Sequence, residues 1–485
     1  MYRRSVSSRR RRSSRSYAHR DRRRRHSSSR RDYRRRHRRH HRSHSSRRYD
    51  SRSSSLENGD IGRYRHCRRD TPRDSHHYHR SRSPSTDDSR GRHRHGDRRH
   101  DRSSSGRYRR RHSYKDSGHR RRRSVVRSRP THRRKHSSRD PIVHFTWEPG
   151  MQLGDYKVLR KIGDGTFGRV LQCEKDGEKF AVKVVRDVEK YVNSAKIEVD
   201  ILMDIKKVDA TGESHCVVLH DHFMYKGRIM CLVFEPLGDS LYEFLKSNGY
   251  KGFFIADIQK IAFQLLKGLA FLKKTRLIHT DLKPENVLLT CGHEDFIEVP
   301  FPRTTTGMMT KRPATADIKI IDFGSTIYED DYHSTIINTR QYRSPEVILD
   351  VGWSYASDMW SLGCILIEIY TGDLLFNTHN HLEHLAMMEQ IVGPLPASML
   401  KAARKTDGRR YLHPTREGLN WPEGAQSRSS EDRVACCRNV MELVRPEHRP
   451  FAEFIKYILN PDPSQRPTPE EAMEHEFLIL TLAES

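Results

Sequence analysis

Asp281-Leu282-Lys283-Pro284-Glu285-Asn286 is the stretch of this 485-residue sequence that decides its interpretation. It places a carboxylate, an ammonium and a carboxamide within six residues, and these groups can move a phosphoryl group from a metal-bound nucleotide to a hydroxyl. Asp281 would accept or orient the hydroxyl proton, Lys283 would stabilise the transferred group, and Asn286 would hold a magnesium ion. Alone, the run also fits a surface turn of mixed charge, so the flanking motifs must decide.

Downstream, Asp322-Phe323-Gly324 follows Asn286 by 36 residues and comes directly after the apolar run Ile318–Ile321. The tripeptide is common by itself, but here it stands in the order that phosphoryl transfer requires. We therefore expect the Asp322 carboxylate to bind the magnesium ion that bridges the β- and γ-phosphates.

Upstream lies a glycine-rich loop, Gly163-Asp164-Gly165-Thr166-Phe167-Gly168-Arg169-Val170. Glycines allow backbone amides to approach phosphates, and Val170 would close over the adenine. A dinucleotide-binding fold or a plain hairpin would also explain GxGxxG, but the residues after the loop alternate as strands do. In the second of these strands, Lys183 would reach the α- and β-phosphates.

A helical pattern follows over residues 188–205, and Glu198 within it is our choice for the carboxylate that pairs with Lys183. Glu189 is an alternative close to the helix start, and an unpaired surface glutamate is another. The apolar strand Ile229–Phe234 then runs into Glu235-Pro236-Leu237-Gly238. This pattern predicts a hinge between two lobes, with the Glu235 and Leu237 backbones binding adenine and Phe234 narrowing the pocket. A core strand ending in a turn is compatible with the same pattern.

The charge divides the chain into two parts. Residues 1–140 hold 51 Lys and Arg against 13 Asp and Glu, a net charge of +38, whereas residues 141–485 hold 41 against 49, a net charge of −8. The first part has almost no large apolar residues and repeats Arg-Ser steps without a fixed period, so it is predicted to be disordered. The rest is long enough for a packed core in two lobes. We place a linker at 141–155, the catalytic domain at 156–477 and a tail at 478–485.

No apolar region follows the first arginines and no apolar run approaches 18 residues, so the sequence predicts neither a secretory signal nor a membrane span. The eight cysteines lack paired CxxC spacing, and we interpret the adjacent Cys436 and Cys437 as ordinary reduced thiols of an intracellular protein. Basic clusters at 22–25, 34–39 and 120–123 are candidate nuclear import signals, although a solvated charge run explains each one nearly as well.

Together these motifs make residues 156–477 resemble a eukaryotic protein kinase. His279-Thr280-Asp281, Tyr342-Arg343 and the run Glu383–Gln390 narrow the resemblance to the CDC-like, or LAMMER, dual-specificity kinases, whose EHLAMMER signature ends here in Gln390 instead of arginine. Leu382, just before that run, and Leu385, Ala386 and Met388 within it would form one buried helix face. The resemblance implies an α+β, bilobal fold with a β-rich N-lobe and an α-helical C-lobe, preceded by the Arg/Ser-rich extension. It also implies a short hairpin at 290–316.

The resemblance assigns roles to further residues. Asp358 would brace the catalytic loop and Arg466 would pair with Glu346. Asp281, Lys283, Lys183 and Glu198 are the catalytic set, and Asn286 and Asp322 bind metal. The expected ATP-binding residues are Ile162, Gly163, Asp164, Gly165, Thr166, Phe167, Gly168, Arg169, Val170, Ala181, Lys183, Phe234, Glu235, Leu237 and Leu288. The activation segment runs from Asp322 to Glu346 and contains Ser334, Thr335, Thr339 and Tyr342.

One departure is informative. Most protein kinases place His-Arg before the catalytic aspartate, and this chain has His279-Thr280. That arginine normally receives a phosphate on the activation segment, so its absence removes part of the charged pocket through which phosphorylation orders the loop. We expect activity without phosphorylation of Ser334, Thr335 or Thr339.

By resemblance, the chain uses ATP and Mg²⁺, phosphorylates serine and threonine of Arg/Ser-rich splicing factors, autophosphorylates on tyrosine and regulates splicing. The expected location is the nucleus, including nuclear speckles, with some protein in the cytoplasm. The Arg/Ser tail is expected to support self-association and incidental RNA contact, and no membrane partner is expected. Two other classes were weighed: an RNA-binding protein that acts through its tail, and an inactive scaffold. The intact Lys183, Asp281, Asn286 and Asp322 argue against the scaffold.

Overall fold

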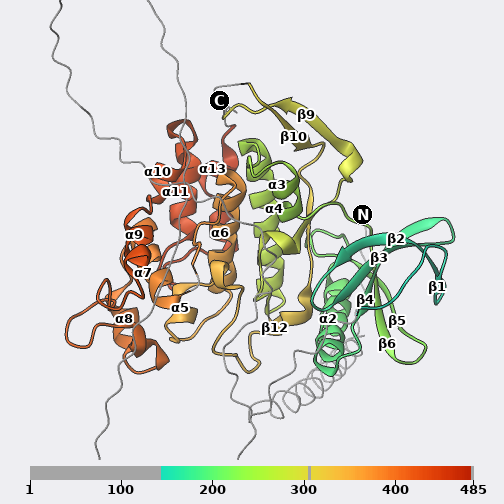
Figure 1. Ribbon diagram of the computed structural model, residues 1–485, viewed down its shortest axis with the longest axis horizontal. Helices are drawn as coiled ribbons and strands as arrows, with labels where there is room; N and C mark the ends of the chain where they lie inside the picture. The colour runs from blue at the N-terminus through green and yellow to red at the C-terminus, as the bar shows by residue number, and fades with distance from the viewer. Residues whose placement is uncertain (1–143, 304–306, 379, 482–485) are drawn as a thin grey trace, which may run out of the picture. The chain divides into compact units, whose positions relative to one another are not determined.

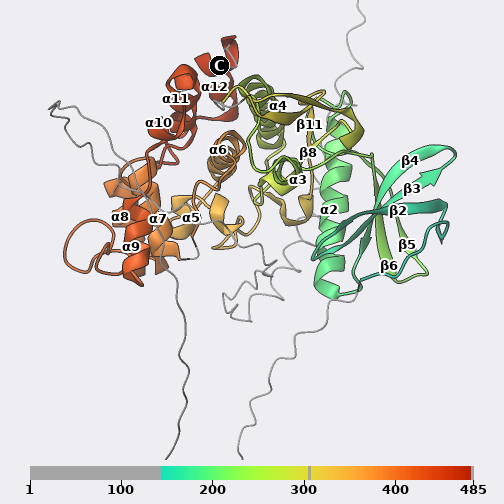
Figure 2. The same ribbon diagram turned by 45° about the horizontal axis from the view of Figure 1, so that its top comes forward.

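The computed structural model describes residues 144–303, 307–378 and 380–481 (Figure 1). The Arg/Ser-rich region 1–140, its predicted disorder, the import signals at 22–25, 34–39 and 120–123 and the start of the linker lie outside the described residues. The described part consists of a β-rich N-lobe followed by a mainly helical C-lobe (Figures 1 and 2).

The N-lobe is an antiparallel six-stranded sheet, in the order β1-β2-β3-β4-β6-β5, with helix α2 packed on one face (Figure 2). Its elements are β1 (Gln152–Leu153), β2 (Tyr156–Asp164), β3 (Gly168–Lys175), β4 (Glu178–Val185), α2 (Glu189–Val208), β5 (Leu219–Tyr225) and β6 (Ile229–Phe234). Strand residues alternate between two apolar clusters: Val182 and Val184 pack in a small cluster on the outer face, and Val185 joins the large cluster that includes α2.

The C-lobe is built around α4 and α6, whose apolar faces meet in the large cluster. Its longer helices are α3 (Leu241–Ser247), α4 (Ile255–Lys274), α6 (Ala356–Thr371), α7 (His381–Ile391), α8 (Ala397–Ala403), α9 (Arg428–Ala435) and α11 (Arg449–Ile458). The shorter helices are α5 (Pro345–Ile348), α10 (Val440–Leu443), α12 (Pro469–Met473) and α13 (Glu476–Ile479). Short strand pairs join β7 (Leu277–Ile278) to β12 (Ile327–Tyr328) and β8 (Val287–Leu289) to β11 (Ile318–Ile320). These pairs bring the two candidate site motifs to one end of α4.

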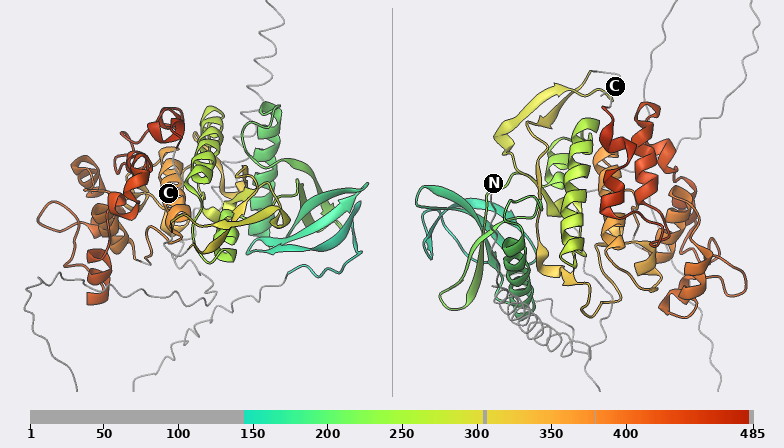
Figure 3. Two further views of the ribbon diagram at one scale, coloured as in Figure 1. Left: turned by 90° about the horizontal axis from the view of Figure 1, so that it is seen from above. Right: turned by 180° about the vertical axis from the view of Figure 1, so that it is seen from behind.

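The hairpin expected at 290–316 is confirmed: β9 (Phe296–Pro300) pairs antiparallel with β10 (Met309–Pro313) beside α3 and α4 (Figure 3). The buried Asn248 side chain ties it down, because its Oδ1 accepts hydrogen bonds from the Thr310 hydroxyl and the Lys311 amide, both at 3.0 Å. The insert is therefore anchored to the C-lobe.

The ordered fold begins before Tyr156, inside the predicted linker. Leu153 is fully buried and pairs with Tyr156, while the Phe145 carbonyl accepts a hydrogen bond from the Arg169 guanidinium at 2.9 Å. Apolar residues in the second half of the linker explain this packing, and the boundaries chosen for linker and tail stay predictions.

Seven of the eight cysteines lie in the described residues. Five of them are buried, and burial raises the pKa of Cys173, Cys216 and Cys231 to about 12. Cys436 is exposed and Cys437 is half-buried. No helix in the described ranges has the length and apolar character needed to cross a membrane.

Candidate active site

Lys183 of β4 lies between two carboxylates that come from different parts of the chain. Its Nζ donates to Glu198 Oε2 of α2 at 2.8 Å and to Asp322 Oδ1 at 3.1 Å. Glu198 is buried because it sits on the α2 face that packs on the sheet, whereas Glu189 is exposed at the first helical position. The geometry therefore selects Glu198 over Glu189 as the partner of Lys183.

Charge pairing, rather than solvent, keeps this trio ionised. Burial opposes the positive charge of Lys183, but Glu198 and then Asp322 hold its pKa above the usual value. Burial also opposes the charge of Asp322, yet the Lys183 ammonium holds the Asp322 pKa below its usual value. Burial raises the pKa of Glu198, and Lys183 opposes that rise. The site thus presents a fixed ammonium and a carboxylate side by side.

The glycine-rich loop joins β2 to β3, and only one of its glycines is required by the protein's own packing. A Cβ on Gly168 would lie 2.3 Å from the Val184 carbonyl oxygen, whereas a Cβ on Gly163 or Gly165 would make only ordinary contacts. The space at Gly163 and Gly165 is free for a ligand to approach the backbone. Asp164 is already paired with Arg169, whose Nε lies 2.6 Å from its carboxylate.

The predicted adenine-binding residues come together around the end of β6. Phe234 pairs with Ala181 across the sheet, and Leu288 of β8 forms a bridge with Ser240 just after the predicted hinge. Val170 pairs with Gly163 on the neighbouring strands, and Ile162 is exposed beside them. The Leu237 amide has no hydrogen-bond partner among the described residues, so it is available to a ligand.

The Glu235 side chain is not directed to a ligand. Its carboxylate accepts a hydrogen bond from the Val218 amide at 2.9 Å and lies 3.7 Å from the Lys319 ammonium. This side chain fastens β6 to the segment before β5, which leaves only the Glu235 backbone for the role that the sequence predicted.

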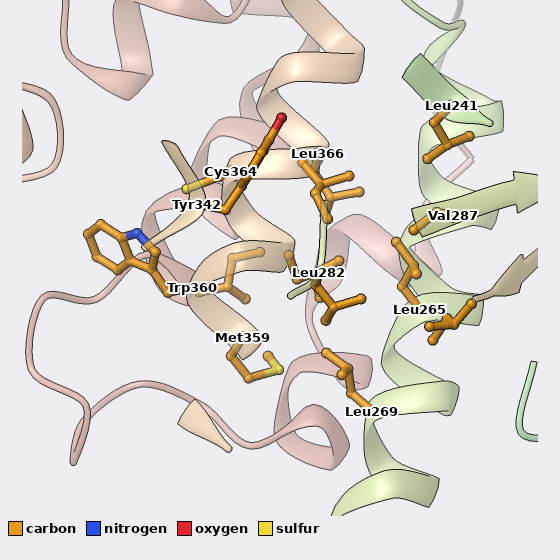
Figure 4. Packing of buried hydrophobic residues seen from close by; sticks show 14 of the residues in the cluster. Leu241, Leu265, Leu269, Leu282, Val287, Tyr342, Met359, Trp360, Cys364 and Leu366 are labelled. Atoms are coloured by element: carbon orange, nitrogen blue, oxygen red, sulfur yellow. The ribbon is translucent and has the colours of Figure 1, made fainter. Parts of the chain in front are cut away.

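The catalytic loop is anchored by Leu282, which is buried between side chains of α4 and α6 (Figure 4). The side chains of Asp281 and Lys283, on either side of Leu282, are partly exposed, and Lys283 Nζ lies 2.6 Å from Asp281 Oδ2. The amide of the buried Asn286 side chain donates to the Asp281 backbone carbonyl at 2.9 Å. Asp281 Oδ1 accepts the hydroxyl of Thr339 at 2.8 Å. The three residues of the motif are therefore one hydrogen-bonded unit.

Asp358 holds the catalytic loop in place through hydrogen bonds, as expected. The buried Asp358 carboxylate accepts the His279 amide at 2.7 Å and the Thr280 amide at 3.1 Å. Thr280, with φ of 66°, donates its hydroxyl to the Ser325 carbonyl at 2.8 Å. The threonine thus links the catalytic loop directly to the start of the activation segment.

Comparison with known proteins agrees with this geometry. A model of the protein kinase domain matches residues 156–478. The serine/threonine-protein kinase AFC3 of Arabidopsis thaliana is 43% identical over 331 residues, which cover 66% of this chain and 81% of that protein. The human dual specificity protein kinase CLK1 is 40% identical over 329 residues, which cover 67% of this chain and 66% of that protein.

The chain is a CDC-like (LAMMER) protein kinase. A crystal structure of a kinase domain, 48% identical in sequence, superposes with a TM-score of 0.67 and covers 70% of this chain and 99% of that one. The predicted bilobal α+β kinase fold and the family resemblance are confirmed.

Most of the signature run of this kinase, Glu383–Gln390 in α7, packs in the interior of the C-lobe. Leu382, Leu385, Ala386 and Met388 are buried as expected, while Gln390 is exposed, so the missing arginine would have pointed to solvent. Sequence reasoning did not find the partner of Glu383, which is buried and pairs with Arg433 Nη2 at 2.7 Å.

The activation segment of the kinase is fixed at both ends. Arg466 and Glu346 form a fully buried ion pair with two hydrogen bonds, at 2.8 and 3.1 Å, as predicted. Ser334 and Thr335 are exposed, but Tyr342 is buried and its hydroxyl donates to Glu368 at 2.7 Å. Tyr342 therefore has a packing role here.

Protein kinases use ATP and Mg²⁺, and the residues of this kinase fit both. Among the described residues no group of three or more His, Cys, Asp or Glu side chains could hold a metal. Magnesium does not need such a group, because one or two oxygen ligands from the protein and the phosphates of the nucleotide suffice. Asp322 supplies a carboxylate, and the carboxamide oxygen of Asn286 has no hydrogen-bond partner in the described part of the chain. These two residues would hold the ion.

Proposed function

We propose that this kinase transfers the γ-phosphoryl group of magnesium-bound ATP to serine and threonine hydroxyls of Arg/Ser-rich proteins, splicing factors among them. We further propose that it autophosphorylates on tyrosine and thereby acts as a dual-specificity enzyme in the nucleus, including nuclear speckles, and to some extent in the cytoplasm. Regulation of splicing would follow from the charge that it adds to these substrates.

One observation carries the reaction type. The Thr339 hydroxyl donates to the Asp281 carboxylate at 2.8 Å, and its Oγ1 lies 3.3 Å from the Lys283 ammonium. An alcohol held between a carboxylate and an ammonium has the contacts that an acceptor serine needs, since its proton can pass to the carboxylate. A substrate hydroxyl would replace that of Thr339 at this position.

The other residues have complementary tasks. The ATP supplies the phosphoryl group and its metal ion neutralises the developing charge. Glu198 holds the Lys183 ammonium in place against the phosphates, and Lys283 offsets charge beside the acceptor oxygen. The buried Phe323 and the Asp358 brace fix Asp322 and Asp281 in position.

The substrate class is supported by charge. Residues 141–485 carry a net charge of −8, which attracts arginine-rich peptides, and the attraction weakens as salt rises. The chain's own first 140 residues carry +38 and 30 serines, so they resemble such a substrate. Phosphorylating about 20–25 of those serines would neutralise the tail.

Phosphosite mapping tests the function. The full chain, incubated with ATP, Mg²⁺ and an Arg-Ser peptide library, should label serines flanked by arginine, and Asp281→Asn should abolish labelling. Asp432→Asn on α9 is a control with the same charge change far from the catalytic loop. Absence of labelled peptides with wild-type enzyme, or equal labelling by Asp281→Asn, would refute the proposal.

A second experiment concerns the tail. Removal of residues 1–140 should change KM or processivity on an Arg-Ser protein at low salt, because the positively charged tail would compete with that substrate for the negatively charged catalytic domain. Analytical ultracentrifugation and RNA filter binding of both forms test the proposed self-association and incidental RNA contact. A fluorescent fusion lacking residues 1–140 should lose its nuclear concentration.

A further inference from the structure

A group of positive side chains lies beside the catalytic loop and takes no part in the chemistry described above. It consists of Arg340 and Arg343 in the activation segment, His381 and His384 in α7, and Arg410. We call these five residues the basic cluster. The ring centroids of His381 and Tyr411 lie 6.0 Å apart, and the Arg410 guanidinium lies 5.3 Å from the same Tyr411 ring. Arg340 and Arg343 are also close enough to both histidines to lower their pKa.

Several nitrogens of the basic cluster are buried and unsatisfied. Arg340 Nε, His381 Nδ1 and both ring nitrogens of His384 have no hydrogen-bond partner among the described residues. His384 is completely buried. A buried polar group without a partner costs on the order of 1–3 kcal/mol, so several in one place indicate that a ligand belongs there.

The acids near the basic cluster are engaged elsewhere. Glu383, next to His384, pairs with Arg433, and Glu346 pairs with Arg466. Asp407 lies 3.7 Å from Arg410, but both side chains are largely exposed.

The charge of the cluster is therefore not neutralised from within. Burial and then the neighbouring Arg340 lower the pKa of Arg343 to about 10, while burial and then the arginines lower the pKa of His381 to about 4. A bound anion would relieve this repulsion.

The position of the cluster suggests where that anion comes from. Arg340 directly follows Thr339, whose hydroxyl is bound to the Asp281 carboxylate, and Asp281 acts on the charge of Arg343. Adjacent residues in an extended peptide are about 3.3–3.6 Å apart, so alternate residues of a substrate are about 7 Å apart. In an Arg-Ser repeat the next serine is two residues from the acceptor.

We propose that the basic cluster is a phosphate subsite, which binds a phosphoserine already present two residues from the acceptor serine in an Arg-Ser repeat. This inference rests on the proposed function and adds to it sequential phosphorylation along the repeat, because each phosphorylated serine favours the phosphorylation of the next serine. Arg340 would supply the main contact, because guanidinium groups bind phosphate oxygens in pairs. Arg343 already donates its Nε and Nη2 to the carbonyls of Ile337 and Asn338, both at 2.8 Å, and would act through its charge.

Two peptides of the same Arg-Ser sequence test this subsite, one unmodified and one with phosphoserine two residues from the single acceptor. A second pair carries the phosphoserine on the other side of the acceptor. In the full-length enzyme, kcat/KM for one phosphorylated peptide should exceed that for its unmodified form by about tenfold. Arg340→Gln should reduce this ratio to about one, whereas Arg449→Gln, the same change at an exposed position of α11, should leave it unchanged. Arg340 is chosen because no hydrogen bond among the described residues is lost with it.

The phosphate could also come from the enzyme's own activation segment, so Ser334→Ala/Thr335→Ala is measured in parallel. A high ratio in both enzymes supports the substrate as the source. A high ratio only in the double variant supports the subsite but shows that the enzyme's own phosphate competes for it. A ratio of one in both enzymes, with normal labelling of the unmodified peptide, overturns the inference and leaves the proposed function intact. No labelling of any peptide refutes the proposed function instead.

Discussion

The two sides of the active site are built from different interactions. On the nucleotide side, Lys183 makes ion pairs with Glu198 and Asp322, and all three are largely removed from solvent. On the acceptor side, Asp281 is exposed to a similar degree as Asp322, but it is satisfied by the Thr339 hydroxyl and amide and by the Lys283 ammonium. The first arrangement is rigid and costly to break, whereas the second can exchange the Thr339 hydroxyl for that of a substrate.

The largest effect is expected on the acceptor side. Asp281→Asn should lower kcat by about 10³–10⁴-fold, because it removes the proton acceptor. Its thermal unfolding midpoint should remain close to that of wild type, since an asparagine oxygen can still accept the Thr339 hydroxyl. A radiolabelled ATP assay and calorimetry measure the two quantities. If turnover persists, Asp281 is not the base.

On the nucleotide side, Lys183→Met should lower kcat/KM by about 10²–10³-fold and also destabilise the fold by about 3 kcal/mol, since it leaves the buried Glu198 and the half-buried Asp322 unpaired. Lys179→Met, an exposed lysine on the same strand, is the matched control. Urea unfolding of both variants gives the stability difference. An unchanged free energy of unfolding for Lys183→Met would show that the two sides do not differ as described.

The contact of Tyr342 with Glu368, which supports the activation segment on the acceptor side, should make the stability of the fold depend on pH. Burial raises the pKa of Glu368 to about 7 from 4.5, and the Tyr342 hydroxyl opposes the rise. Because the folded-state pKa is the higher one, this stability contribution is fully present below about pH 4.5 and is lost as the pH rises through 7. The loss should amount to about 3 kcal/mol.

Glu368→Gln should remove this slope between pH 5 and pH 8 in denaturant unfolding. Glu298→Gln, on the exposed face of β9, should keep it. A slope that is identical in wild type and Glu368→Gln would contradict the assignment.

The smallest effect is expected in the activation segment. Thr280 already bonds the catalytic loop to Ser325, and Trp353 Nε1 donates to the Ser334 carbonyl at 2.8 Å. The double substitution Ser334→Ala/Thr335→Ala should therefore change peptide turnover by less than about threefold. Thr339 is tested separately as Thr339→Ser, which keeps the hydroxyl on Asp281. Loss of turnover in the double variant would show that phosphorylation is required.

Much of this site could be predicted because the motifs are local. The run at 281–286, the Asp322 tripeptide and the glycine loop each have their meaning in short stretches of chain, and their order implied the rest. The Lys183–Glu198 pair was also accessible, since helical periodicity places Glu198 on the face that packs on the sheet.

The contacts that could not be predicted join segments that lie far apart in the sequence. The contact of Thr339 with Asp281 joins residues 58 apart, and that of Tyr342 with Glu368 depends on how the activation segment packs on α6. The strand Gln152–Leu153 was not predicted, because a strand of two residues has no periodicity that a sequence pattern could show. The basic cluster likewise combines three segments, each of which looks like ordinary surface sequence.

The distribution of thiols has a practical consequence. Three of the buried cysteines have a pKa near 12, and thiolates are the reactive form, so alkylating reagents should modify Cys436 and Cys437 first within the described residues. Slow labelling of Cys173 or Cys231, both in the N-lobe sheet, would then report how often that sheet opens. The same preparation, without any engineered cysteine, could thus carry a dye at the end of α9 and report the opening rate of the N-lobe sheet through the slow alkylation of its cysteines, measured by mass spectrometry.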